Sequence, residues 1–288
     1  MNVARAPEEL VAGERAVTMG SFDGVHLGHR RVLDAVRSAD LPATVVTFWP
    51  HPRLVLGNQV ELLTTLERRL ELLAEAGVDE TLVVDFTPEL AEREPANFAD
   101  SLLRQIGTRL IVIGENFRFG RGAAGDPALL ERLGFEVQTL PLAAGVSSTQ
   151  IRTLLREGEV VSAAGLLGRP PEVEGTVVLG YQRGGTLGFP TANLAIPPDL
   201  LVPAYGIYAG YALGHRAAIS IGVNPHYGGN ERRVEPHLLD FEGDLYGRRL
   251  VVQLWRRLRD ERAFTSEQEL IDQIAQDVEE TRTAEPPV

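Results

Sequence analysis

The sequence predicts a protein of two halves: an α/β half with a parallel sheet, followed by an antiparallel β half that ends in one helix. Two observations carry this prediction. Short apolar runs alternate with helical patterns over residues 16–158, which is typical of a parallel sheet covered by helices on both faces. From residue 175 to about residue 260 the runs are strand-like and separated by glycine and proline at hairpin spacing, which indicates a barrel or a sandwich.

The first half contains strands and helices in strict alternation. The predicted strands are 16–20, 44–49, 81–86, 109–114 and 135–141. The predicted helices are 28–38, 62–77, 97–107, 126–134 and 147–158. In the second of them, leucines 63, 66, 70 and 73 share one helical face. Because parallel sheets bind ligands at the carboxyl ends of their strands, we expect a site in the loops that follow these strands.

The pattern changes at residues 166–175, where Pro170 and Pro171 indicate a linker or a domain start. The strand-like runs that follow are 175–181, 192–196, 206–213, 216–223, 237–241 and 249–255. Ser266 and Glu269 form a capping box for a terminal helix. The inner face of that helix carries Leu270, Ile271, Ile274 and Val278. We therefore expect two domains, residues 1–168 and 169–288.

The composition of the 288 residues excludes several classes of protein. A net charge of −12 argues against a general affinity for nucleic acid or anionic membranes. Cysteine is absent, which excludes disulfides and thiolate chemistry, and lysine is absent, which excludes a Walker A loop and Schiff-base catalysis. The stretch MNVARAPEELVAGERAV lacks an apolar core of signal-peptide length, and no apolar stretch approaches the ~20 residues that span a bilayer. We expect a cytoplasmic protein, a monomer or weak homo-oligomer, with neither nucleic-acid nor membrane partners.

The stretch GSFDGVHLGHR, residues 20–30, follows the first predicted strand and carries His26 and His29. A helix N-terminus presents unpaired N–H groups and partial positive charge, so it suits a phosphate, and two imidazoles add donors. The alternative is a pair of surface or capping histidines, and the spacing alone leaves both open. Gly20, Phe22 and Asp23 favour the phosphate site, because they indicate a backbone held close to a ligand.

Several stretches resemble known motifs, in the order of one family. GSFDGVHLGHR resembles the H-x-G-H signature of the nucleotidyltransferase superfamily. Further similar stretches are TFWPHP (47–52), IGENFRFGRGAAGD (113–126), VSSTQIR (146–152), LGFPTANL (187–194), VEPHLLDFEGDLYG (234–247) and LRDERAF (258–264). Together they resemble the prokaryotic bifunctional riboflavin kinase/FMN adenylyltransferases, or FAD synthetases, over nearly the whole chain. The resemblance implies a Rossmann-like N-terminal domain that makes FAD and a C-terminal β-barrel that phosphorylates riboflavin, both with ATP and Mg²⁺.

Adenylyl transfer needs no general base, because the FMN phosphate is already mostly ionised, so positioning and electrostatic stabilisation carry the catalysis. The resemblance implies that His26 and His29 act at the α- and β-phosphates of ATP and that Arg152 holds the departing pyrophosphate. It also implies a nucleotide site of Gly20, Phe22, Asp23, Ser147, Ser148 and Thr149, and a flavin site of Phe48, Pro50 and Asn116. Each of these segments also has a purely structural interpretation. Residues 147–149 can be a helix cap, residues 48–50 can be a strand end that runs into a proline turn, and Asn116 can belong to a plain loop.

Phosphorylation of riboflavin calls for a base, because its ribityl hydroxyl must lose a proton as the γ-phosphoryl group arrives. The resemblance implies Glu235 as this base, Mg²⁺ on Thr191 and Asn193, and flavin or phosphate on Arg259. In an extended segment Thr191 and Asn193 lie on one face, and they offer neutral oxygen ligands. The resemblance adds Gly188 and Pro190 to the nucleotide site. The alternatives are a solvated strand for residue 235, a proline turn for residues 190–193 and a solvated arginine at residue 259.

Some positions depart from the family pattern, and they lie in the kinase half. Gly184 and Gly185 stand where the family has glycine and arginine, with Arg183 as a candidate substitute. His226 and Tyr227 replace the family's threonine and phenylalanine. Pro236 follows the proposed base and suggests an edge strand or a bulge. Two narrower functions therefore stay open: an adenylyltransferase with a weakened kinase domain, and a regulator that binds flavin or nucleotide without turnover.

Overall fold

The computed structural model describes residues 1–179, 188–223 and 232–288. Arg183, Gly184, Gly185, His226 and Tyr227 lie outside the described residues, so the departures at these positions stay untested. The chain forms two compact units. The first comprises residues 1–60 and 66–146, and the second comprises residues 61–65 and 147–288.

The first unit is built on a parallel sheet of six strands in the order β1-β4-β3-β2-β5-β6. The strands are β1 (Asn2–Ala4), β2 (Arg15–Met19), β3 (Ala43–Trp49), β4 (Glu80–Asp85), β5 (Thr108–Gly114) and β6 (Glu136–Leu140). The helices are α1 (Leu27–Arg37), α2 (Pro52–Val55), α3 (Leu66–Glu75), α4 (Pro88–Ala91), α5 (Pro95–Phe98) and α6 (Pro127–Arg132). Short turns are η1 (Pro7–Glu9), the π-helical η2 (Ala99–Arg104) and η3 (Arg121–Ala123). The parallel α/β fold predicted for this half is confirmed.

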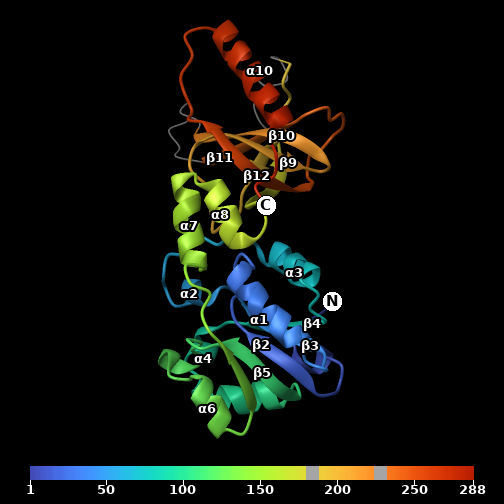
Figure 1. Cartoon of the computed structure of the whole chain (residues 1–288), viewed down its shortest axis with the longest axis vertical. Helices are drawn as coiled ribbons and strands as arrows, with labels where there is room; N and C mark the ends of the chain where they lie inside the picture. The colour runs from blue at the N-terminus through green and yellow to red at the C-terminus, as the bar shows by residue number, and fades with distance from the viewer. Residues whose placement is uncertain (180–187, 224–231) are drawn as a thin grey trace. The chain divides into compact units, whose positions relative to one another are not determined.

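The central strands of this sheet carry apolar side chains on both faces because helices cover them. All five residues of β2 are buried, as are the first five of β3. Helix α1 packs against β2, β3 and β5 (Figure 1). It buries Leu33 and Val36. The segment predicted as one helix over 97–107 instead passes from α5 into the π-helical η2. The short edge strand β1 was not predicted, because three residues show no periodicity.

The second unit is a closed antiparallel barrel in the order β10-β11-β8-β7-β12-β9. Its strands are β7 (Glu172–Val178), β8 (Asn193–Ala195), β9 (Gly206–Ala212), β10 (His215–Val223), β11 (Arg232–Leu238) and β12 (Arg249–Arg259). Its helices are α7 (Ser148–Glu157), α8 (Val160–Leu167) and α10 (Glu267–Thr283). The predicted antiparallel half is thus a barrel, and the predicted terminal helix is confirmed. Ser266 caps it by accepting a hydrogen bond from the Glu269 backbone N–H at 3.2 Å.

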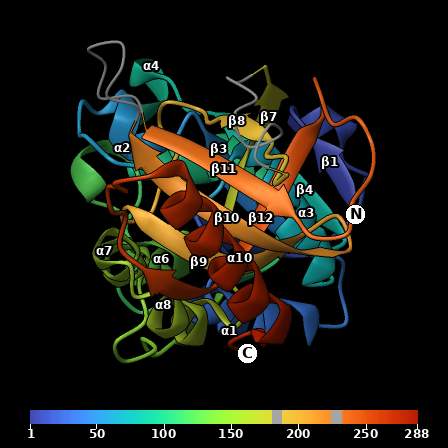
Figure 2. The same ribbon diagram turned by 90° about the horizontal axis from the view of Figure 1, so that it is seen from above.

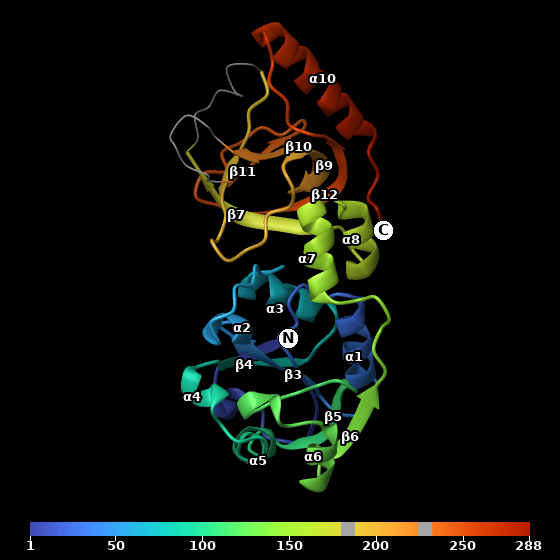
Figure 3. The ribbon, with the colours of Figure 1, turned by 90° about the vertical axis from the view of Figure 1, so that its left-hand side faces the viewer.

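Helices cover the outer surface of this barrel. Helix α10 packs on β9 and β10, and it crosses over them when the barrel is seen from above (Figure 2). Helix α8 packs on β12 and on α7 (Figure 3). One hydrophobic cluster joins Ile151, Leu155 and Leu167 of these helices to Tyr208 and Leu254 of the barrel. Helices α7 and α8 therefore belong to the compact unit of the barrel, and a domain boundary at 168/169 stays a prediction.

The expectation that Pro236 marks an edge or a bulge is wrong. β11 lies between β10 and β8, and its register with β10 pairs Pro236 with Ile219 without a shift. The Pro236 carbonyl oxygen accepts a hydrogen bond from the Ala192 backbone N–H at 2.9 Å. Because the N–H and C=O of a strand residue point to the same neighbour, the missing N–H of Pro236 faces Ala192, just before β8 begins. The proline therefore costs the β10–β11 ladder no hydrogen bond.

Candidate active sites

The first candidate site lies at the carboxyl edge of the parallel sheet. β3, β2 and β5 are adjacent in the sheet. Phe48–Pro50 lie at and just after the end of β3, Phe22–His29 run from the turn after β2 into α1, and Asn116 follows β5. Adjacent parallel strands end at the same edge, where ligands of open α/β sheets bind. The fold therefore brings three separately predicted segments of the adenylyltransferase site to one edge of the first unit.

The turn between β2 and α1 has an unusual backbone. Phe22 and Val25, both buried, have φ angles of 49° and 38°, and Gly24 has a φ of 83°. Residues with bulky side chains rarely occupy this left-handed region, and they persist there only when the surrounding structure holds them. Such backbone conformations are concentrated at ligand sites, which agrees with the expectation drawn from Gly20, Phe22 and Asp23.

His26 caps α1 and stacks on His29. The Nδ1 of His26 accepts a hydrogen bond from the His29 backbone N–H at 3.3 Å, and the two ring centroids are 3.6 Å apart. In a neutral ring whose Nδ1 accepts, Nε2 carries the proton and donates. The capping alternative is therefore correct for His26, and it orients the opposite ring nitrogen as a donor suited to a phosphate oxygen. A Cβ on Gly28 would lie only 3.1 Å from the His26 ring, so a larger residue at position 28 would crowd this ring.

The predicted flavin residues of the first unit lie at the same edge. Phe48, half-buried, packs edge-on against Phe86 with ring centroids 5.7 Å apart. Pro50 and Asn116 are exposed. Their contact with a flavin stays a prediction.

The stretch 147–152 belongs to the second unit. Ser147 caps α7 by accepting a hydrogen bond from the Gln150 backbone N–H at 3.2 Å, so the capping alternative is confirmed for it. The buried Arg152 donates from Nε to the Glu61 carbonyl oxygen at 2.6 Å. That residues 147, 148, 149 and 152 join His26 and His29 in one site stays a prediction.

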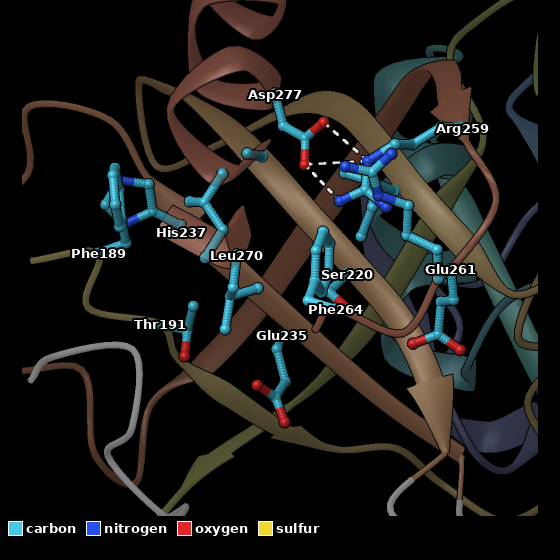
Figure 4. A pocket seen from close by; sticks show the side chains of 14 residues that line it. Phe189, Thr191, Ser220, Glu235, His237, Arg259, Glu261, Phe264, Leu270 and Asp277 are labelled. Carbon is cyan, nitrogen blue, oxygen red and sulfur yellow. Dashed lines mark hydrogen bonds and ion pairs between the residues drawn. The ribbon is translucent and has the colours of Figure 1, made fainter. Parts of the chain in front are cut away.

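The second candidate site is a cavity of about 320 Å³ between the outer face of the barrel and α10 (Figure 4). Its polar lining includes Thr191, Ser220, Glu235, Arg259 and Asp277. Its apolar lining includes Phe189, Ile207, Ala218, Phe264, Leu270 and Ile274. A largely apolar cavity with a few convergent polar groups is the usual form of a small-molecule site. Of the predicted kinase residues, Thr191, Glu235 and Arg259 meet here.

Strand register explains why these residues meet. Glu235 of β11 is paired with Ser220 of β10, Ser220 with Ile207 of β9, and Ile207 with Arg259 of β12. Directly opposite residues of antiparallel strands project on the same face, so these four form one cross-strand row. The pairing of Leu194 with Val234 extends the row, since it puts Asn193 opposite Glu235.

The same register holds the segment before β8. If the antiparallel register of Leu194 with Val234 continues toward the N-terminus of β8, Thr191 lies opposite His237, on the same face as Asn193. His237 donates from Nδ1 to the Pro190 carbonyl oxygen at 2.7 Å and meets the Phe189 ring edge-on at 5.7 Å. His237 was not predicted, although its position two residues after Glu235 on a strand was a usable signal. It fixes the backbone that carries the proposed metal ligands.

Glu235 has the electrostatic surroundings of a base. Its side chain is 31% exposed, and the nearest Arg233 nitrogen is 3.8 Å from its Oε1. Burial raises the pKa of Glu235, and the Arg233 charge only partly opposes this. Burial also raises the pKa of Glu261, which lines the same cavity. The Arg259 charge opposes this increase, and the Glu235 charge adds to it. A carboxylate with a raised pKa accepts a proton more readily at neutral pH, as a general base must.

Arg259 is held by α10. Its Nε and Nη2 donate to the Asp277 carboxylate, with distances of 2.9 Å to Oδ1 and 2.6 Å to Oδ2 (Figure 4). Asp277 is buried and was not predicted, because a single polar residue beside the apolar face of a helix carries no signal by itself. The pair fixes the guanidinium at the wall of the cavity, and the contact of Arg259 with flavin or phosphate stays a prediction.

Comparisons with known proteins cover nearly the whole chain. Residues 9–153 match the family model described as FAD synthetase, and residues 167–284 match the one described as riboflavin kinase. A bifunctional riboflavin kinase/FMN adenylyltransferase of Escherichia coli (strain K12) is 36% identical, over 96% of this chain and 93% of the relative. Its counterpart from Bacillus subtilis (strain 168) is 32% identical, over 95% and 94%.

One solved structure has the same fold throughout. It comes from Streptococcus pneumoniae and is described as a macrolide-efflux protein, with a TM-score of 0.87, 30% identity and coverage of 98% of this chain and 99% of that one. Within residues 1–179, 188–223 and 232–288 of the present protein, no helix has the length and apolar character needed to cross a membrane. By both family models and by 36% identity over 96% of its length to one relative, the chain belongs to the family of bifunctional riboflavin kinases/FMN adenylyltransferases.

Proposed function

We propose that the protein phosphorylates riboflavin to FMN and then transfers an adenylyl group from ATP to FMN, giving FAD and pyrophosphate. The cavity of the second unit carries the first half of this proposal, because one cross-strand row aligns Glu235 with the other polar groups of an otherwise apolar site. The match of both halves to the two family models supports two activities over adenylyl transfer alone.

In the kinase reaction the ribityl hydroxyl of riboflavin attacks the γ-phosphorus of ATP. An O–P bond forms, the bond to the β-phosphate oxygen breaks, and ADP leaves. Glu235 accepts the hydroxyl proton, helped by its raised pKa. Phe189, Phe264 and Leu270 offer the apolar surface on which an isoalloxazine ring packs.

We place Mg²⁺ on Thr191 and Asn193. Both are neutral oxygen donors, and they lie two residues apart beside the row that contains Glu235. When bound, Mg²⁺ neutralises charge on the ATP phosphates, which themselves balance the charge of the ion. Within the described residues there is no group of three His, Cys, Asp or Glu side chains that could hold a metal, so the neutral pair stands as the candidate. Gly188 and Pro190, in the backbone fixed by His237, belong to the proposed nucleotide site.

In adenylyl transfer an ionised FMN phosphate oxygen attacks the α-phosphorus of ATP, and the bond to the β-phosphate breaks. His26 donates from Nε2 to the phosphates, and His29, stacked on it, completes the pair. Arg152 and the hydroxyls of Ser147, Ser148 and Thr149 hold the departing pyrophosphate, and Phe48, Pro50 and Asn116 hold the flavin. Gly20, Phe22 and Asp23 form the turn over the nucleotide.

The net charge of −12 argues against nucleic-acid partners and agrees with a monomer or weak homo-oligomer that acts on small molecules. The absence of cysteine agrees with a cytoplasmic location. The function is tested by incubating the protein with riboflavin, ATP and Mg²⁺ and separating riboflavin, FMN and FAD by chromatography. Both FMN and FAD are expected. FAD from supplied FMN but none from riboflavin would identify an adenylyltransferase with a weakened kinase domain. No product from riboflavin or from FMN, despite binding, would identify a regulator that binds flavin or nucleotide.

A further inference from the structure

Helix α3 contributes a completely buried arginine to the first unit. The side chain of Arg69 has 0% exposure, although α3 belongs to none of the motif stretches of the adenylyltransferase half. Desolvation of a guanidinium is costly unless charged and aromatic neighbours compensate for it. The neighbours of Arg69 therefore indicate why a charge is kept there.

The first neighbour is Asp23. Arg69 Nη2 lies 3.6 Å from Asp23 Oδ1, and the Asp23 side chain is only 2% exposed. Asp23 stands in the strained turn between Phe22 and Gly24, three residues before His26. An ion pair excluded from solvent is screened very little, so it restrains this turn strongly.

The second neighbour is Trp49. The Arg69 guanidinium lies 5.6 Å from the centroid of a Trp49 ring, within the range of a cation–π contact. Trp49 ends β3 and lies between Phe48 and Pro50, two residues of the proposed flavin site. One guanidinium thus contacts both the turn that carries the histidines and the loop assigned to the flavin.

We propose that Arg69 is a positioning residue for adenylyl transfer. It holds the turn that leads to His26 (residues 22–25) and the segment assigned to the flavin (residues 48–50) at a fixed separation. This inference rests on the proposed function of the first unit. A planar guanidinium pairs with a carboxylate and lies over an aromatic ring at the same time, whereas a lysine ammonium makes a point contact. The distance between the FMN phosphate and the α-phosphate of ATP then depends on Arg69, although Arg69 need not touch either substrate.

The test compares Arg69→Met and Arg69→Lys with a matched control, Arg104→Met. Arg104 also pairs with a carboxylate, with 2.7 Å between its Nε and Asp100 Oδ1, and its Cζ lies 4.6 Å from the centroid of the Phe135 ring. Its side chain is exposed, however, and it lies outside both segments that Arg69 contacts. FAD formation from supplied FMN is measured well below the unfolding temperature of each variant. FMN formation from riboflavin, in the other half of the same chain, reports whether that half is intact.

For Arg69→Met we expect kcat for FAD formation to fall about 100-fold, the usual effect of a small misplacement of reacting groups, while FMN formation is unchanged. KM for ATP and FMN should change much less than kcat, because the binding groups themselves are intact. Arg69→Lys should fall between Arg69→Met and the native protein, and Arg104→Met should match the native protein. When Asp23→Asn is already present, Arg69→Met should lower kcat for FAD formation by a smaller factor than it does in the native protein, because the Arg69–Asp23 ion pair is already broken.

If Arg69→Met does not fold, Arg69→Lys decides, because it keeps the charge in the buried position. A normal kcat in Arg69→Lys together with full additivity with Asp23→Asn would overturn the proposal, as would a normal kcat in a folded Arg69→Met. A native protein that makes no FAD from FMN would instead overturn the proposed function.

Discussion

His26 and Ser147 each cap a helix with a side chain that was also assigned to phosphate binding. Both caps are present in the structure: His26 Nδ1 lies 3.3 Å from the His29 backbone nitrogen, and Ser147 Oγ lies 3.2 Å from the Gln150 backbone nitrogen. The two interpretations, which the sequence left as alternatives, are compatible, because a ring or hydroxyl that caps a helix at one atom lies among the unpaired N–H groups that attract anions. Residue type and spacing alone could not distinguish them.

The surroundings of Glu235 predict how the kinase activity depends on pH. Burial raises its pKa in the folded protein, and the base must be ionised to accept a proton. As the pH falls, a group with a raised pKa is protonated earlier than an ordinary carboxyl. The kcat/KM for riboflavin phosphorylation should therefore decline on the acid side at a pH above the ordinary glutamate pKa, because kcat/KM reports the free enzyme.

A pH–rate profile of FMN formation checks this expectation, with the pH stability of the protein measured in parallel. The acid limb should be absent from the residual activity of Glu235→Gln. An acid limb at or below the ordinary carboxyl pKa would show that Glu235 is not the group that titrates.

At the scale of elements, the period of apolar residues was sufficient to predict most strands and helices, and the register was not accessible. The cross-strand row brings together residues 207, 220, 235 and 259, which come from four separate strands. No local pattern determines which residue of one strand opposes which residue of the next. For the same reason Pro236 was misread: its effect depends on whether its missing N–H would face β10 or the segment before β8.

Helix α10 forms one wall of the cavity in the second unit. Ile274 lines the cavity, whereas Ile271, predicted for the same inner face, does not. Ile274→Ala should weaken riboflavin binding about tenfold. Alanine offers the ligand less apolar surface than isoleucine, and the lost contact corresponds to about 1.4 kcal/mol of binding free energy. Ile271→Ala is the matched control and should leave affinity nearly unchanged.

Titration of riboflavin by its fluorescence measures both affinities. Equal effects of Ile271→Ala and Ile274→Ala would mean that α10 acts through general stability and not as a wall of the flavin site.

At the scale of the whole molecule, the sequence was sufficient to predict two halves of different class, but not which helices accompany the barrel. The change at Pro170 and Pro171 suggested a boundary after residue 168. The structure groups α7 and α8 with the barrel, because their apolar side chains share its core. Such long-range packing leaves no local mark in the sequence, and the predicted boundary is open to direct test.

Two fragments, 147–288 and 169–288, make that test. Ile151, Leu155 and Leu167 are buried in the barrel's cluster, and each such side chain contributes about 1.5–3 kcal/mol when fully buried. Fragment 147–288 should therefore unfold at distinctly higher urea concentration and phosphorylate riboflavin unaided. Equal stability and kinase activity in 169–288 would instead support the boundary at 168/169.

One chain is expected to carry two separate reactions, with Glu235 essential to one and His29 to the other. The measurement is product analysis of Glu235→Gln and His29→Ala, each given riboflavin or FMN together with ATP and Mg²⁺. Glu235→Gln should lose FMN formation by about 10²–10⁴-fold while it still converts FMN to FAD. His29→Ala should still make FMN but lose FAD formation by about 10²–10³-fold. Near-normal FMN formation by Glu235→Gln, or near-normal FAD formation by His29→Ala, would contradict the account.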